Sequence, residues 1–152
     1  MRPYVTALER RRLKAQAIDL PRSKAERAVP VFIEKVAAGS IAGGHSYGGR
    51  VASMAAIQVR YAGLVLLSYP LHRPGHPEQL RTEHWPAITC PVLLLSGDAD
   101  PFARIELLRS SVRQLKNAEL VIFPRVGHGL LPVVDQAMER AAAFVRALSS
   151  NR

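Results

Sequence analysis

The feature that most constrains the fold is the alternation of short apolar runs with segments of helical periodicity. Leu64–Tyr69 and Val92–Ser96 are continuous apolar runs of strand length, as expected for strands that helices cover on both faces. Between such runs, apolar residues recur at intervals of three and four, which is typical of amphipathic helices. Strands and helices that alternate in this way usually form βαβ units. The sequence therefore predicts an α/β fold with a mostly parallel sheet and helices on both faces.

The remaining elements follow from the same two patterns. The other predicted strands are Ala17–Leu20, Ser40–Gly43 and Leu120–Phe123. The predicted helices are Pro3–Lys14, the segment from Ser23 to Val36, Tyr47–Gln58, the segment from Pro101 to Leu115, and Val134–Leu148. Pro30 lies inside the second helix, which therefore either kinks there or begins there. Residues 70–91 are rich in proline and histidine without a clear period, which indicates a long loop.

Length and cysteine usage limit the class of protein. The 152 residues are enough for one buried core, so we expect a single domain over residues 1–152. Cys90 is the one cysteine, which excludes an internal disulfide and fits a reducing cytosol. No stretch reaches the roughly 18 apolar residues of a membrane span, and the first residues lack the apolar core of a secretory signal. We expect a cytoplasmic protein that has no membrane partner.

The net charge of +9 raises the question of a nucleic-acid partner. The basic residues are spread along the chain, and the one dense run, Arg10 to Lys14, lacks the aromatic residues of a stacking platform. We interpret the charge as a solvated surface and do not expect nucleic-acid binding. A homo-oligomer remains open.

A glycine-rich stretch carries the first candidate for chemistry. Gly44-His45-Ser46-Tyr47-Gly48 has the form G-x-S-x-G and lies between a predicted strand and a predicted helix. This context allows a strained turn that exposes a serine hydroxyl. The alternative is that the small residues only let the strand and the helix pack closely at a tight turn. A phosphate-binding loop is a poorer fit, because the Gly-Lys-Ser/Thr ending and the G-x-G-x-x-G register are both missing.

A serine nucleophile needs a histidine base and a carboxylate that holds the histidine. Asp98 and Asp100 directly follow the apolar run Val92–Ser96, and His128 follows the last predicted strand. The carboxyl ends of parallel strands meet at one edge of a sheet, so these groups are expected to converge with Ser46. Either aspartate fits the acid role, and Asp98 could instead cap the following helix.

These strings resemble a known family. GGHSYGGR, GDADPF and GHGL look like the α/β-hydrolase superfamily, and LLSYPLHRPG with LRTEHWP resembles its small lidless branch of dienelactone-hydrolase-like bacterial proteins, which is related to testis-expressed protein thirty. The resemblance covers nearly the whole chain. It implies Ser46 as nucleophile, His128 as base and Asp100 as the orienting acid. It also implies that the Tyr47 N–H is one donor of the oxyanion hole.

The resemblance also implies a segment that this sequence does not show. In the family, a strand ending in a histidine-glycine loop precedes the first helix, and that loop supplies the second oxyanion donor. The family's strand order places this strand between the equivalents of Ala17–Leu20 and Ile41–Gly43, so its loss would leave unpaired backbone groups within the sheet. We therefore expect an N-terminally shortened version of a longer protein.

The loop over residues 70–91 holds further polar candidates. His72, His76 and His84 could suggest a metal site, but Pro74 and Pro77 prevent the first two from sharing a helix face. No regularly spaced Cys or acidic ligand accompanies them, so no metal is expected. His45, Leu71 and His72 are predicted to contact substrate. Arg81 and His84 could bind an anion or face water, and we favour water.

The sequence thus predicts a serine hydrolase that cleaves a small ester, thioester or lactone through an acyl-enzyme and needs no cofactor. The alternative is a catalytically weak or inactive scaffold of the same fold within a protein complex.

Overall fold

Four parallel strands form the centre of the computed structural model, which describes residues 1–150. They are β1 (Ile41–His45), β2 (Gly63–Leu67), β3 (Val92–Gly97) and β4 (Ala118–Phe123). Their order in the sheet is β1-β2-β3-β4, so each strand lies beside the next one along the chain. The register pairs His45 with Leu67 and Leu67 with Leu95, which brings the carboxyl ends of the first three strands to one edge.

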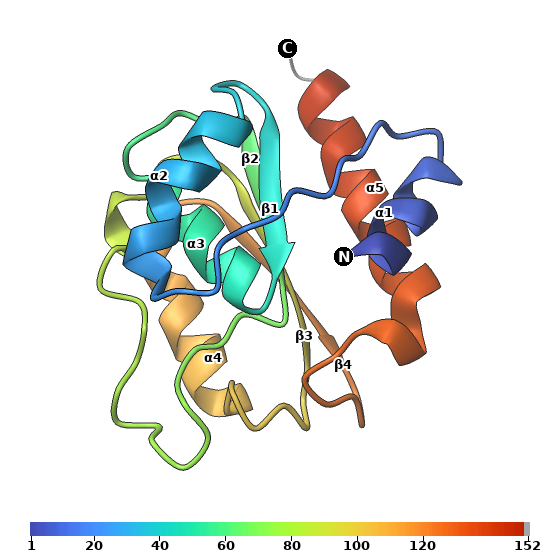
Figure 1. Ribbon diagram of the computed structural model, residues 1–152. Coiled ribbons are helices and arrows are strands. Elements are labelled where there is room, and N and C mark those ends of the chain that lie inside the picture. Colours follow the sequence, from blue (N-terminus) through green and yellow to red (C-terminus); the bar gives the residue numbers. More distant parts are fainter. Residues whose placement is uncertain (151–152) are drawn as a thin grey trace.

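Helices cover both faces of this sheet (Figure 1). α1 (Arg2–Glu9) and α5 (Val134–Ser150) pack together on one face. The opposite face is covered by α2 (Ala25–Lys35), α3 (Tyr47–Ala55) and α4 (Ile105–Ser111). The predicted class, a parallel sheet between two helical layers, is confirmed. Within residues 1–150 no helix is both long and apolar enough to cross a membrane.

Two apolar clusters fill the space between the sheet and its helical layers. Leu64, Leu66 and Leu94 face the larger cluster, which contains Phe32 of α2 and Trp85 of the long loop. Leu67, Leu93 and Leu95 alternate with these residues along the strands, and they face the smaller cluster, which contains Tyr4 and Met138. All six residues of β3 are buried. This two-sided burial explains why the central strands show continuous apolar runs rather than alternation.

The N-terminal segment differs from its prediction in two places. α1 ends at Glu9 rather than Lys14, and Arg12 then adopts a left-handed conformation with φ 63°. The prediction of a strand at Ala17–Leu20 was wrong, because this segment has no strand neighbour and forms no strand. The expected gap within the sheet is therefore absent. Instead β1 is an edge strand, paired with β2 alone.

A cavity of about 510 Å³ lies along the free edge of β1. Its walls come from α1, the segment 13–18, α2, β1 and α5, and include Tyr4, Ile41 and Gly43. The cavity does not include Ser46, Asp100 or His128.

Smaller differences have local causes. α2 continues through Pro30 as one helix, Ala25–Lys35. β2 ends at Leu67 rather than Tyr69, because Ser68 has a φ of 51° and leaves the strand conformation. α4 begins at Ile105 rather than Pro101, since residues 101–103 form a turn on Asp100. The loop 70–91 contains one short 3₁₀ segment, Trp85–Ala87.

Gly97 lies at the end of β3, where the segment leading to His128 crosses close above it. A Cβ at this position would overlap the Val126 carbonyl. We expect Gly97→Ala to lower the free energy of unfolding by about 1 to 3 kcal/mol, because the crossing backbone must move. Chemical denaturation measures this loss. Gly127→Ala is the matched control, since a Cβ there meets nothing within 4 Å, and an equal loss in both variants would contradict the packing argument.

Candidate active site

Ser46 occupies a sharp turn between β1 and α3. Its backbone angles, φ 51° and ψ −117°, lie in a region that costs a non-glycine residue about 1 to 3 kcal/mol. The Ser46 N–H donates to the Leu67 carbonyl at 2.8 Å, which ties the turn to β2. A Cβ at Gly44 would overlap the backbone of Gly48, so strand and helix approach this closely only with glycines. The turn holds the Ser46 side chain at the carboxyl edge of the sheet.

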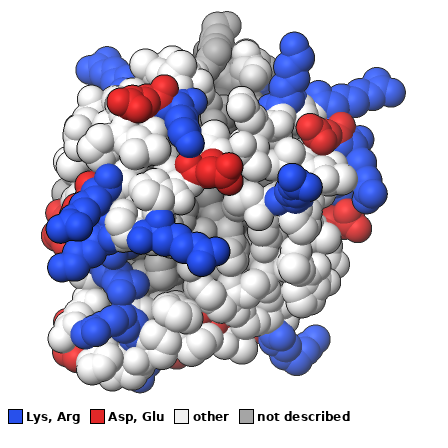
Figure 2. Space-filling view, viewed as in Figure 1, with Lys and Arg blue, Asp and Glu red and all other residues white. Residues whose placement is uncertain are grey.

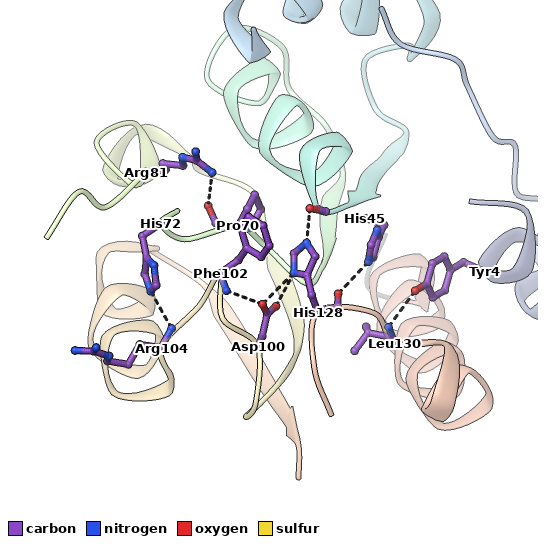
Figure 3. Close-up of polar contacts among 11 residues, drawn as sticks. Tyr4, His45, Pro70, His72, Arg81, Asp100, Phe102, Arg104, His128 and Leu130 are labelled. Atoms are coloured by element: carbon purple, nitrogen blue, oxygen red, sulfur yellow. Dashed lines mark hydrogen bonds and ion pairs between the residues drawn. The ribbon is translucent and has the colours of Figure 1, made fainter. Parts of the chain in front are cut away.

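The imidazole of His128 connects this hydroxyl to a carboxylate. His128 Nε2 lies 2.7 Å from Ser46 Oγ, and Nδ1 lies 3.0 and 2.8 Å from the two carboxylate oxygens of Asp100. Figure 3 shows the ring held between these partners. An ionised carboxylate only accepts, so Nδ1 carries the proton and Nε2 is free to accept from the Ser46 hydroxyl. The hydroxyl therefore faces the basic nitrogen.

Asp100 is well placed to orient this ring. Its side chain is 0% exposed, and Oδ1 also accepts the Phe102 N–H at 2.8 Å. The Phe102 ring stacks on the imidazole with centroids 4.2 Å apart. His128 keeps 26% of its side chain exposed, so the base remains reachable. The acid is thus shielded from water, while the base and the nucleophile face the surface.

Asp98, the competing candidate for the acid, has another partner. Its Oδ1 accepts the Arg125 N–H at 2.7 Å, and its residue is exposed. It therefore joins the loop after β3 to the loop that carries His128, and it does not cap the following helix. This geometry favours Asp100 over Asp98 as the partner of the imidazole.

A second pair of aromatic rings holds the loop of His128 from the other side. His45 Nε2 donates to the His128 carbonyl at 3.2 Å, and burial lowers the pKa of His45, which keeps this ring neutral at pH 7. The Tyr4 ring stacks on His45 at 5.6 Å, and its hydroxyl accepts the Leu130 N–H at 3.2 Å. Figure 3 shows Tyr4 and His45 side by side against residues 128–130. These two residues, which we call the Tyr4–His45 clamp, are hydrogen-bonded to the loop at the His128 carbonyl and the Leu130 N–H.

Tyr4 and Phe102 were not among the site residues predicted from sequence. Their contacts join segments 126 and 26 residues apart, and neither belongs to a motif. For His45, predicted to contact substrate, the structure shows a bond to the neighbouring loop.

The other residues predicted to contact substrate lie in the interior. Leu71 is fully buried in the larger apolar cluster. His72 is also buried, donating from Nδ1 to the Arg73 carbonyl at 2.9 Å and accepting the Arg104 N–H on Nε2 at 3.0 Å. Both ring nitrogens of His72 are thus hydrogen-bonded to backbone groups. These contacts do not support a role for His72 in substrate binding.

His84 is half-buried and does not face water as expected. Its Nε2 lies 2.8 Å from Ser53 Oγ, which itself donates to the Arg50 carbonyl at 2.7 Å. His84 Nε2 must therefore donate to Ser53, so this nitrogen cannot accept the proton of the Ser53 hydroxyl. In residues 1–150 no three His, Cys, Asp or Glu side chains are grouped to hold a metal.

The first turn of α3 faces the space in front of Ser46. The first helical hydrogen bond of this turn runs from the Arg50 N–H to the Ser46 carbonyl, at 3.1 Å. The earlier N–H groups, including that of Tyr47, have no partner within the helix and carry the positive end of its dipole. A negative charge that develops on an oxygen next to Ser46 would be stabilised here.

Comparisons with known proteins agree with the observed fold. The family model described as "Alpha/beta hydrolase domain" matches residues 3–151. Among solved structures, Est1E from Butyrivibrio proteoclasticus is similar with a TM-score of 0.64 and 20% identity, over 82% of this chain and 68% of that one. The monoacylglycerol lipase of Paleococcus ferrophilus gives a TM-score of 0.67 and 18% identity, over 86% and 77% of the two chains.

An alpha-beta serine hydrolase homologue from Coxiella burnetii gives a TM-score of 0.65 and 16% identity, over 93% of this chain and 74% of that one. At such identities the solved structures support the fold, and the family model supports membership. This chain therefore belongs to the alpha/beta hydrolase domain family.

Proposed function

We propose that this protein is a serine hydrolase that cleaves a small ester, thioester or lactone through an acyl-enzyme. One observation carries the proposal: Ser46, His128 and Asp100 are linked by hydrogen bonds of 2.7 and 2.8 Å in the order that a nucleophile, base and orienting acid require. The likeness to esterases and lipases of the same fold supports it. We assign the activity to one domain, residues 1–152.

The geometry gives each group a step. His128 Nε2 removes the proton as Ser46 Oγ attacks the substrate carbonyl, and a bond forms between Oγ and the carbonyl carbon. The Tyr47 N–H stabilises the negative charge on the carbonyl oxygen. His128 then protonates the leaving alcohol, thiol or ring oxygen as its bond to carbon breaks. His128 Nε2 next takes a proton from water, whose oxygen bonds to the acyl carbon. The bond between this carbon and Oγ then breaks, the acid leaves, and His128 returns the proton to Ser46.

Asp100 stays ionised throughout and stabilises the imidazolium that forms in each step. Every proton transfer is accounted for by His128, so no metal or cofactor is assigned a step. We further propose the dienelactone-hydrolase-like branch as the nearest group, on the motifs after β2, and a cytoplasmic location, on the single cysteine.

A fluorophosphonate probe tests the proposal directly, because such probes modify serines that a neighbouring base activates. We expect labelling of the native protein and a phosphonyl adduct that mass spectrometry locates on Ser46. Hydrolysis of para-nitrophenyl esters of short acids should accompany it. A protein that takes up no probe and cleaves none of these esters would be the inactive scaffold, and the proposal would fail.

The Tyr4–His45 clamp adds a prediction about positioning. Tyr4→Phe keeps the stacked ring but removes the acceptor of the Leu130 N–H, which should cost about 1 kcal/mol of folding free energy. We expect kcat to fall several-fold with little change in KM, because the base shifts while the substrate contacts remain. Steady-state kinetics separate the two constants. A change confined to KM would mean that Tyr4 touches substrate rather than positioning His128.

A further inference from the structure

Arg81 is a half-buried cation that lacks an acidic partner. Among residues 1–150 its side chain makes a single hydrogen bond, a long one of 3.5 Å from Nη1 to the Pro70 carbonyl. It forms no ion pair with any carboxylate in residues 1–150. Burial lowers the pKa of Arg81, and the positive charges of Arg50 and Arg73 lower it further, against smaller opposite effects of Tyr69 and Glu26. A guanidinium in this setting is costly unless an anion joins it.

Arg50 adds a second guanidinium with an unused donor. It lies one turn after the nucleophile, since its N–H donates to the Ser46 carbonyl. Its side chain is 22% exposed, and its Nε is buried without a hydrogen bond among the described residues. Its acidic contact is Glu26 at 3.5 Å, a carboxylate whose own side chain is 60% exposed. Glu26 thus offsets part of the positive charge.

Arg81 and Arg50 are connected to the nucleophile site through backbone groups next to it. Pro70, which Arg81 reaches, follows β2 by three residues, and the Leu67 carbonyl at the end of β2 accepts the Ser46 N–H. On the other side, the His72 N–H donates to the Phe102 carbonyl at 3.0 Å, and the Phe102 ring stacks on His128. Figure 3 shows Arg81, Pro70, Phe102 and His128 in succession.

The chain as a whole carries an excess of positive charge, +9 at pH 7. Figure 2 shows Lys and Arg side chains spread over this face of the molecule, with Asp and Glu side chains among them. The net charge favours the approach of an anionic ligand, and Arg81 and Arg50 would supply the local contacts. Arg73, the third arginine of the group, is exposed and donates to the Gln79 amide oxygen at 3.0 Å.

We propose that Arg81, with Arg50, binds a carboxylate on the substrate, so that the preferred ester is a half-ester of a dicarboxylic acid. This inference rests on the proposed hydrolase function. A planar guanidinium matches a carboxylate with paired N–H donors. Arg50 already has Glu26 as an acidic contact, so Arg81 is the guanidinium whose charge is left for a single carboxylate.

The test compares two substrates that share a leaving group and a chain length: the para-nitrophenyl half-ester of adipic acid and para-nitrophenyl hexanoate. We expect the native protein to prefer the adipate ester in kcat/KM. Arg81→Gln should lower kcat/KM for adipate by about tenfold to hundredfold, the usual effect of losing a hydrogen bond to a charged group. The loss for hexanoate should be much smaller, and Arg81→Lys should recover part of the preference.

Arg140→Gln is the matched control, because Arg140 pairs with Glu119 on the surface at 2.7 Å, far along the sheet from the carboxyl edge of the strands. It should not change the ratio of the two substrates. Three results would overturn the proposed subsite. In Arg81→Gln, kcat/KM could fall equally for both esters or for neither, and the native protein could prefer the hexanoate ester. If Arg81→Gln does not fold, the ratio of kcat/KM for the two esters is measured in Arg81→Lys and Arg50→Gln instead.

Binding without turnover separates this inference from the proposed function. In Ser46→Ala, monomethyl adipate should bind by calorimetry, and adding Arg81→Gln should weaken that binding by the same tenfold or more. Binding that depends on Arg81, without hydrolysis by the native protein, would end the hydrolase proposal and keep the anion site. Hydrolysis without discrimination, or binding that ignores Arg81, would end the anion site and keep the hydrolase.

Discussion

Ser46→Ala is expected to abolish fluorophosphonate labelling and to lower kcat for ester hydrolysis by about 10⁴-fold or more. The substitution removes the atom that attacks the carbonyl, and base and acid cannot replace it. Gel fluorescence measures the first effect and stopped assays on para-nitrophenyl esters the second. The fold should survive, because alanine only deletes a hydroxyl whose partner is His128.

Ser53→Ala provides the control for this result. Ser53 is also paired with a histidine, His84, at 2.8 Å, but its hydroxyl donates to a carbonyl and His84 Nε2 cannot accept its proton. Labelling and hydrolysis should therefore persist in Ser53→Ala. Equal labelling of native protein and Ser46→Ala would show that the probe reacts elsewhere, and the assignment of Ser46 would fall.

Asp100→Asn should give the second largest effect, a fall in kcat of roughly 10⁴-fold with an intact fold. An asparagine can present an N–H to His128 Nδ1, which favours the tautomer that carries its proton on Nε2. That nitrogen would then be unable to accept the proton of Ser46, although the distances of 2.7 and 2.8 Å could be kept. Kinetics with para-nitrophenyl esters measure the loss.

Asp98→Asn is the informative comparison for that variant. An asparagine keeps the oxygen that accepts the Arg125 N–H, so both loops stay joined and kcat should change little. The opposite outcome, a large loss in Asp98→Asn and a small one in Asp100→Asn, would reverse the two roles and contradict the observed geometry.

Periodicity and motif spacing were sufficient to predict the central part of the fold from the sequence. The apolar runs at Leu64 and Val92 became β2 and β3, because burial on both faces leaves an unambiguous signal. Strand polarity predicted that Ser46, His128 and the acidic loop after β3 converge, since each follows a parallel strand. The choice of Asp100 over Asp98 rested on the family resemblance. Strand ends were less certain, because features such as the left-handed Ser68 depend on tertiary contacts.

The N-terminal segment shows where this reasoning fails. Ala17–Leu20 has a strand-like composition but no neighbour to pair with, and an isolated strand gains no hydrogen bonds. The Tyr4–His45 clamp and the stacking of Phe102 on His128 could not be predicted from the sequence either. Both depend on how helices and loops dock, which local patterns do not encode.

The position of β1 has a consequence for how the protein would lose activity. The nucleophile follows a strand that is supported by a neighbour on one side only, whereas Asp100 follows the central strand β3. Edge segments fray at a lower free energy than the middle of a sheet. Brief detachment of β1 would carry the hydroxyl away from its imidazole while the interior stays intact, so catalytic competence and cooperative unfolding are governed by different barriers.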